Sequence, residues 1–169
     1  MDRPLERLRQ EIETAVEGMT AERLNWHPVG KWSAAEVLEH LYLTYTGTIK
    51  GFERVAAAQR ALCSKPTWTH RRRRFVVVHL GYMPPGREAP AGTQPRGLAA
   101  EKLVEEIGSR ITEMDEMIAR CERVLGRGQV LDHPILGPLT AAQWRKFHLV
   151  HGRHHLKQIR QLRESGEMS

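Results

Sequence analysis

The sequence predicts an all-α protein, a four-helix bundle formed by a single domain over residues 1–169. Apolar residues recur every three or four positions in four long segments, the spacing of amphipathic helices. Two of these segments begin with a capping-box pattern, and no segment shows a strong strand alternation. A long Pro- and Gly-rich loop is expected between the second and third long helices. Four amphipathic helices joined by loops are typical of a bundle.

The first long helix is expected over residues 4–17. Pro4 suits the first helical turn, where a missing N–H costs nothing, and Gly18 is expected to end the helix. Residues 19–31 mix Asn, Pro and Gly with a few large apolar residues, which indicates a packed connector. The apolar face of the first helix consists of Leu5, Leu8, Ile12, Ala15 and Val16.

The second long helix is expected to start at the capping box Ser33-Ala-Ala-Glu36 and to extend to about residue 61. Residues 64–97 break the helical pattern, and the short apolar run at 75–78 is ambiguous between helix and strand. A loop of this length tends to be functional or mobile.

The third long helix is expected over residues 98–125. A turn-rich segment, residues 126–138, then leads to a second capping-box pattern, Thr140-Ala-Ala-Gln143. The final helix is expected over residues 141–164, and we find no internal repeat in the chain.

Composition indicates a soluble globular protein. Apolar residues make up 40% of the chain and charged residues 27%. The first residues are charged and no stretch reaches the roughly 18 apolar residues of a membrane span, so we expect a cytoplasmic protein without membrane contact. Cys63 and Cys121 form no C-x-x-C pair, and we interpret both as buried free thiols.

A basic run, Arg71–Arg74, carries much of the formal net charge of +6. Nucleic-acid binding is the weaker interpretation of this run, because no helix-turn-helix, zinc-finger or RNP signature accompanies it. A solvated run, or one that faces an acidic partner, explains it better.

The final helix carries four histidines within eight residues: His148, His151, His154 and His155. His151 and His155 lie one turn apart on the same helix face, which is how one helix offers two nitrogen ligands to a metal ion. His148 falls on the same arc and is interpreted either as a neighbour of the site or substrate contact, or equally as a surface or core residue without a role in the site. His154 points off the arc and is expected at the surface or an interface.

Two ligands on one helix need a third from elsewhere. Among the remaining histidines, His40 is the one well inside a predicted helix, close to its inward face, where cofactor sites of bundles are built. Taken alone, His40 is better explained as a hydrogen-bonded core histidine than as a ligand. His27, His70, His79 and His133 lie in connectors and are not expected to be ligands.

Two motifs resemble the DinB-like (DinB/YfiT) superfamily. The first is W-S-x-x-E-V-L-x-H-L at residues 32–41, and the second is H-x-x-H-H-x-x-Q-I at residues 151–159. The loop M-P-P-G-R-E-A-P at residues 83–90 also looks like an insertion found in one branch of that family. The resemblance covers nearly the whole chain and implies a four-helix bundle with a non-sequential helix order and a three-histidine metal site. The implied ligands are His40, His151 and His155.

The resemblance implies a function in two forms. One is a metal-dependent thiol S-transferase, in which a divalent ion (zinc, nickel or iron) activates a low-molecular-weight bacterial thiol toward a small electrophile. The alternative is a non-enzymatic, stress-related binding module with a structural or vestigial metal. Glu36 is expected to cap Ser33 rather than orient the site. Arg153 and Lys157 are interpreted as solvated charges in preference to contacts with an anionic thiol. A homodimer is also expected, because bundles with an exposed helix face often dimerise.

Overall fold

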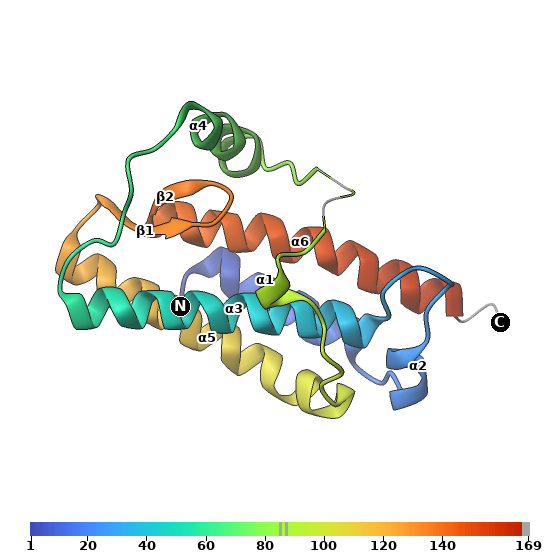
Figure 1. Ribbon diagram of the computed structural model, residues 1–169. Coiled ribbons are helices and arrows are strands. Elements are labelled where there is room, and N and C mark those ends of the chain that lie inside the picture. Colours follow the sequence, from blue (N-terminus) through green and yellow to red (C-terminus); the bar gives the residue numbers. More distant parts are fainter. Residues whose placement is uncertain (85, 87, 167–169) are drawn as a thin grey trace.

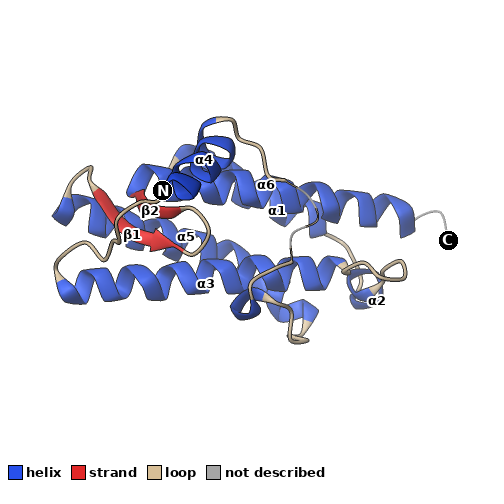
Figure 2. Cartoon of the chain, turned by 45° about the horizontal axis from the view of Figure 1, so that its top comes forward, coloured by secondary structure: helices blue, strands red, loops and turns tan. Residues whose placement is uncertain are grey.

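The computed structural model describes residues 1–84, 86 and 88–166. Helices dominate this part of the chain (Figures 1 and 2). In chain order the helices are α1 (Arg3–Val16), α2 (Ala21–Asn25), α3 (Ala34–Ala58), α4 (Trp68–Arg74), α5 (Ala100–Leu125) and α6 (Ala141–Gly166). A π-helical turn, Phe75–His79, continues α4, a 3₁₀ turn spans Ala91–Thr93, and two short strands, β1 (Gln129–His133) and β2 (Gly137–Thr140), precede α6.

Three of these helices, α3, α5 and α6, are long, and the shorter α1 packs alongside them (Figure 1). In that view α1 and α6 run in one direction and α3 and α5 in the other. Both α1 and α3 pack against α5 and α6. Because α3 and α5 run the same way, the chain between them has to return along the molecule, which explains the long connection over residues 59–99. No helix in the described part of the chain is both long enough and apolar enough to cross a membrane.

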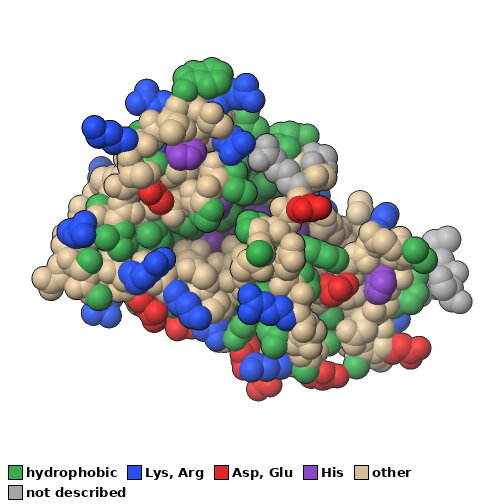
Figure 3. Space-filling model, viewed as in Figure 1, with side chains coloured by type: hydrophobic (Ala, Val, Ile, Leu, Met, Phe, Trp, Pro, Cys, Tyr) green, Lys and Arg blue, Asp and Glu red, His purple; other side chains and the backbone are tan. Residues whose placement is uncertain are grey.

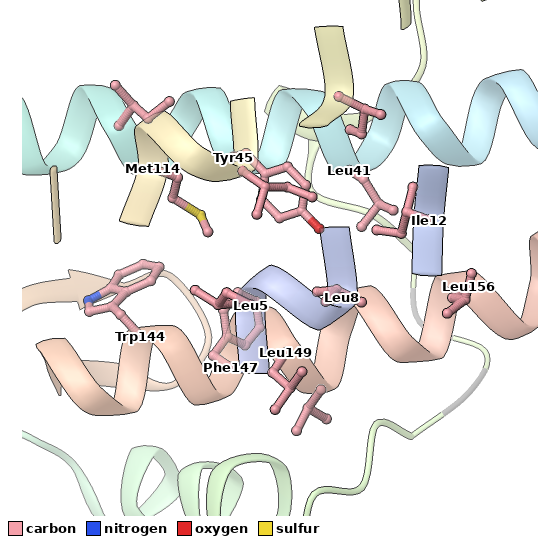
Figure 4. Packing of buried hydrophobic residues seen from close by; sticks show 14 of the residues in the cluster. Leu5, Leu8, Ile12, Leu41, Tyr45, Met114, Trp144, Phe147, Leu149 and Leu156 are labelled. Atoms are coloured by element: carbon pink, nitrogen blue, oxygen red, sulfur yellow. The ribbon is translucent and has the colours of Figure 1, made fainter. Parts of the chain in front are cut away.

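The core lies between α1, α3, α5 and α6. Leu5, Leu8 and Ile12 of α1 face Tyr45 of α3, Met114 of α5 and Trp144 and Phe147 of α6 (Figure 4). The predicted apolar face of the first helix is confirmed, since its five residues are all buried. Burying side chains of this size is the main stabilising contribution to such a fold, about 1.5–3 kcal/mol for each large one.

Capping boxes start the two helices that carry the histidines. At α3, the Ser33 N–H donates to Glu36 Oε2 over 2.7 Å and the Glu36 N–H donates to Ser33 Oγ over 3.1 Å. At α6, Thr140 and Gln143 make the same reciprocal pair over 3.1 and 3.2 Å. Both predicted caps are confirmed, and they fix where each helix begins and hence which residues face inward.

The fold is mostly helical, as predicted, but it also contains a small β-hairpin that the sequence analysis did not predict. Strands β1 and β2 pair antiparallel, and β1 and the start of β2 fall in the segment predicted to be turn-rich. The Trp144 indole N–H donates to the Leu131 carbonyl over 3.1 Å, which holds the hairpin on α6. Leu62 extends the hairpin through a bridge to Leu131. The prediction missed these strands because each is at most five residues long and because Gly137 and Pro138, both typical of turns, occupy β2.

Other boundaries also differ from the sequence prediction. The connector 19–31 contains the short helix α2, and the broken segment 64–97 contains α4 and the π-helical turn. α3 ends at Ala58 instead of residue 61, where Gln59 adopts a left-handed conformation with φ of 50°. Pro85 and Arg87 of the loop motif lie outside the described residues.

The two cysteines differ in exposure. Cys121 is buried, as expected, and its thiol contacts the Phe52 carbonyl oxygen at 3.4 Å. Cys63 is exposed, so the prediction of a buried thiol was wrong there. Cys63 follows the end of α3 in an irregular segment, where the helical period no longer indicates which side faces the core.

Candidate metal centre

Three histidine side chains converge between α3 and α6. The Nε2 atom of His151 lies 3.1 Å from Nε2 of His40 and 3.1 Å from Nε2 of His155. Each of the three residues offers a nitrogen, and these nitrogens lie within 4.8 Å of one another. All three residues are buried. The structure therefore brings together the residues that the sequence motifs select.

The outer ring nitrogens are held by hydrogen bonds. His40 Nδ1 lies 2.8 Å from the Thr93 carbonyl oxygen, and His155 Nδ1 lies 2.7 Å from Gln158 Oε1. A carbonyl oxygen only accepts, so both Nδ1 atoms carry the proton and both Nε2 atoms present a lone pair. This arrangement, an imidazole anchored by its outer N–H, is the usual support of a metal ligand.

The inner nitrogens do not satisfy one another. His151 Nε2 has at most one proton, so at most one of its two 3.1 Å contacts is a hydrogen bond. Its Nδ1 is buried without a hydrogen-bond partner among the described residues. A cation between the three Nε2 atoms would accept a lone pair from each of them. Tetrahedral ligands at about 2.1 Å from zinc lie about 3.4 Å apart, close to the separations found here.

Burial keeps the three imidazoles neutral. It lowers the pKa of His155 to about 3 and the pKa of His151 well below its usual value, and it also lowers the pKa of His40. The proximity of the other histidines adds to the lowering at His151 and His155. Neutral imidazole is the form that coordinates metal ions, so the burial favours the ligand state at neutral pH.

The other two histidines of α6 occupy different surroundings. His148 is completely buried, its Nε2 pairs with Thr48 Oγ1 at 3.1 Å, and its ring stacks against Trp144 at 5.7 Å. His148 is therefore part of the core, the second of its two interpretations. His154 is half-buried, lies beside His155 with ring centroids 5.1 Å apart and lines the cleft described next.

The three converging imidazoles open onto a cleft of about 1090 Å³. Figure 3 shows histidine side chains in the depth of this hollow, with hydrophobic side chains around it. Its walls come from α3, from the loop before α5, from the β-hairpin and from α6. This volume is slightly above the usual range for small-molecule sites, roughly 300–1,000 Å³. The site is thus not closed by protein on all sides.

The charged residues that the sequence analysis considered for the site do not line the cleft. Glu36 is the partner in the Ser33 cap. Arg153 and Lys157 are exposed and do not line the cleft, whereas Lys31, which the sequence interpretation did not consider, does. The ring of Trp32, also missed, lies 5.3 Å from that of His40 and lines the same cleft.

Glu39 is a further residue that the sequence interpretation missed. Its side chain is buried, with 1% of its surface exposed. Its two carboxylate oxygens accept hydrogen bonds from the backbone N–H groups of Arg96, Gly97 and Leu98, over 2.8, 2.9 and 3.1 Å. These bonds tie α3 to the loop that carries Thr93, the anchor of His40. A charged residue on an apolar helix face, next to His40, was the available signal.

The run Arg71–Arg74 lies entirely in α4, and none of its four residues lines the cleft of the three converging imidazoles. Arg74 donates to the Pro138 carbonyl over 2.8 Å, and the Arg72 guanidinium lies over the Trp68 ring at 5.5 Å. Among the connector histidines, His133 accepts from the backbone N–H groups of Ile135 and Leu136 over 3.1 and 3.2 Å and so holds the hairpin turn. None of the connector histidines joins the three converging imidazoles.

Replacing Gln158 by alanine is expected to weaken metal binding about 10- to 100-fold, the usual effect of losing the partner that orients a histidine ligand. The reason is that His155 Nδ1 loses its acceptor and the ring is free to rotate. Competition with a metal-binding dye measures the affinity. Gln161→Ala is the matched control, because Gln161 lines the cleft without a hydrogen bond to a histidine. Equal affinities for both variants would contradict an orienting role for Gln158.

Comparison with known proteins agrees with the motifs. The family model of the DinB superfamily matches residues 4–159. The uncharacterized protein YuaE of Bacillus subtilis (strain 168) is 28% identical over 167 residues, with 94% of each chain covered. No solved structure gave a significant match. Because the family model spans nearly the whole chain, including α3 and the histidines of α6, this protein belongs to the DinB superfamily.

Proposed function

We propose that this protein is a metal-dependent S-transferase that joins a low-molecular-weight thiol to a small electrophile. The observation that carries the proposal is the position of the three neutral imidazoles, which converge on one point and open onto a cleft large enough for a small molecule. Closed structural sites are usually four-coordinate and all protein, whereas three protein ligands and an open side are typical of catalytic sites.

His40, His151 and His155 would hold the metal ion. Imidazole donors suit zinc, nickel and iron alike, so the donor set selects a divalent transition metal without naming one. When bound, such an ion acts as a Lewis acid and lowers the pKa of a thiol, which supplies a thiolate nucleophile at neutral pH.

The residues around the histidines prepare the site. The Thr93 carbonyl and Gln158 fix two of the rings, so the nitrogen lone pairs need no reorientation before binding. Burial of the three rings excludes water from one side of the site. Lys31 lines the cleft and would bind a carboxylate on the thiol. Trp32 provides an apolar wall next to His40.

The proposed reaction is a substitution. The sulfur of the thiol forms a bond to an electrophilic carbon, the bond from that carbon to its leaving group breaks, and the leaving group departs with the electron pair. The thiol proton is released to water. No oxidant or reductant is required, and none of the described residues forms a covalent bond with the substrate.

The proposal is tested by assaying the metal-loaded protein with a panel of low-molecular-weight bacterial thiols and 1-chloro-2,4-dinitrobenzene as electrophile. We expect conjugation above the uncatalysed rate with at least one thiol, measured by absorbance, and its loss after chelation or in a His155→Ala variant. If bound metal changes no rate with any thiol, the proposal fails, and a binding module with a structural or vestigial metal becomes the better explanation.

A further inference from the structure

The cleft has an apolar half beside the histidines. Leu131 and Ile135 of the hairpin segment and Trp144 and Phe147 of α6 line it. The Phe147 ring stacks on His151 with centroids 5.3 Å apart and planes 12° apart, so the apolar half adjoins the metal centre directly. The Trp144 N–H is already donated to the Leu131 carbonyl, which leaves its ring as an apolar surface.

One face of α3 forms the opposite boundary of this cleft. Residues that line it recur at helical spacing: His40, Leu43, Thr44, Gly47, Thr48, Gly51 and Arg54. Gly51 lies eleven positions after His40, about 16 Å along the helix. Two of the seven are glycines, and glycine inside a helix lowers its stability relative to alanine. Each glycine therefore needs a reason.

The two glycines have different surroundings. A Cβ atom on Gly51 would lie 2.7 Å from Leu131 Cδ2, so Gly51 is explained by the close approach of the hairpin. A Cβ atom on Gly47 would meet nothing within 4 Å. Gly47 is exposed, lies in the middle of α3 and lines the cleft. Packing within the protein thus explains Gly51 and gives no reason for Gly47.

We infer that the space over Gly47 is a binding site for the apolar body of a ligand, of the size of an aromatic ring system. Calling this ligand the electrophilic substrate rests on the proposed function, whereas the site itself is defined by Gly47 and the four apolar side chains. Phe147 lines this cleft and its ring stacks on His151, so a ligand body seated beside Phe147 lies next to the histidines and its reactive end can reach them. The hydrophobic effect favours a neutral apolar body in such a site over a charged one.

Gly47→Leu tests this inference, because leucine would fill the space and the helix would tolerate it. The probe is the neutral dye N-phenyl-1-naphthylamine, whose fluorescence rises in apolar surroundings. We expect the Kd of the dye to rise at least tenfold in Gly47→Leu while the midpoint of thermal unfolding stays equal or rises. Ala57→Leu is the matched control, since Ala57 is an exposed residue of α3 that does not line the cleft, and its Kd should stay within twofold of the parent.

Three outcomes decide the inference. A Kd unchanged in Gly47→Leu overturns it, and so does a lower unfolding midpoint in both Gly47→Leu and Gly47→Ala, because Gly47 would then serve packing. A Kd that rises equally in Ala57→Leu also overturns it. The same titration with metal-free protein and with His155→Ala separates this inference from the proposed function. Dye binding that persists in both, together with absent transferase activity, would reject the reaction and retain the site.

Discussion

Replacing His155 by alanine is expected to abolish stoichiometric metal binding. The parent protein, purified in the presence of zinc, nickel or iron salts, should contain close to one ion per chain by elemental analysis. The variant removes one of three converging nitrogens, and the remaining two lie on different helices. We expect a loss of affinity larger than the roughly 10- to 100-fold that follows removal of an orienting partner.

Stability gives a second measurement of the same change. A ligand that binds only the folded state stabilises it by about 2.7 kcal/mol at a concentration 100 times its Kd. Added metal should therefore raise the unfolding temperature of the parent and leave that of His155→Ala unchanged. His154→Ala is the matched control, because His154 is the neighbouring residue and lies outside the three converging imidazoles. Equal metal content in parent and His155→Ala would refute the site.

Replacing Glu39 by alanine is expected to destabilise the fold and weaken metal binding together. Three backbone N–H groups lose a buried charged acceptor. These N–H groups are partly exposed, so they can form hydrogen bonds to water instead. We therefore expect the free energy of unfolding to fall by about 3 kcal/mol. That loss corresponds to a decrease of roughly 6–12 °C in unfolding temperature for a chain of this size. Thr93, held by the same loop, would then no longer fix His40.

Two further variants define the role of Glu39. Glu39→Gln keeps one oxygen acceptor and should have a smaller effect on unfolding than Glu39→Ala, because an amide nitrogen cannot accept from the remaining N–H groups. Glu53→Ala removes an exposed carboxylate from the same helix and should leave both stability and metal affinity nearly unchanged. If Glu39→Ala unfolds no more easily than Glu53→Ala, the loop is held by other contacts.

Local patterns predicted most helix positions and few of the loops. The apolar period located α1, α3, α5 and α6, and the capping boxes located the starts of α3 and α6 within one residue, because both signals depend on residues close in sequence. The hairpin and α4 escaped prediction. Their stability comes from distant partners, such as Trp144 for β1 and Pro138 for Arg74, and such partners leave no periodic signal in their own segments.

The residues of the candidate site likewise differ in how far the sequence predicted them. The spacing of His151 and His155 by itself put two imidazoles on one helix face, and the helical pattern put His40 near the interior of another. From its own surroundings His40 fitted a core residue better than a ligand, and the resemblance to the DinB-like family selected it as a ligand. Thr93 carried no signal in the sequence, and the charge of Glu39 on an apolar face did not reveal its partners, because the bonds that join α3 to the loop connect residues more than fifty positions apart.

The sequence by itself determined the helical periods, the capped starts of α3 and α6 and the family to which the chain belongs, because these depend on short-range patterns. The tertiary structure decided which nitrogens meet, that Thr93 and Gln158 orient two of the rings, and that a cleft with an open space over Gly47 adjoins them. The physical reason is that convergence of side chains and the shape of a cavity depend on how α3, α6 and the hairpin pack together. No segment of the chain carries that information alone.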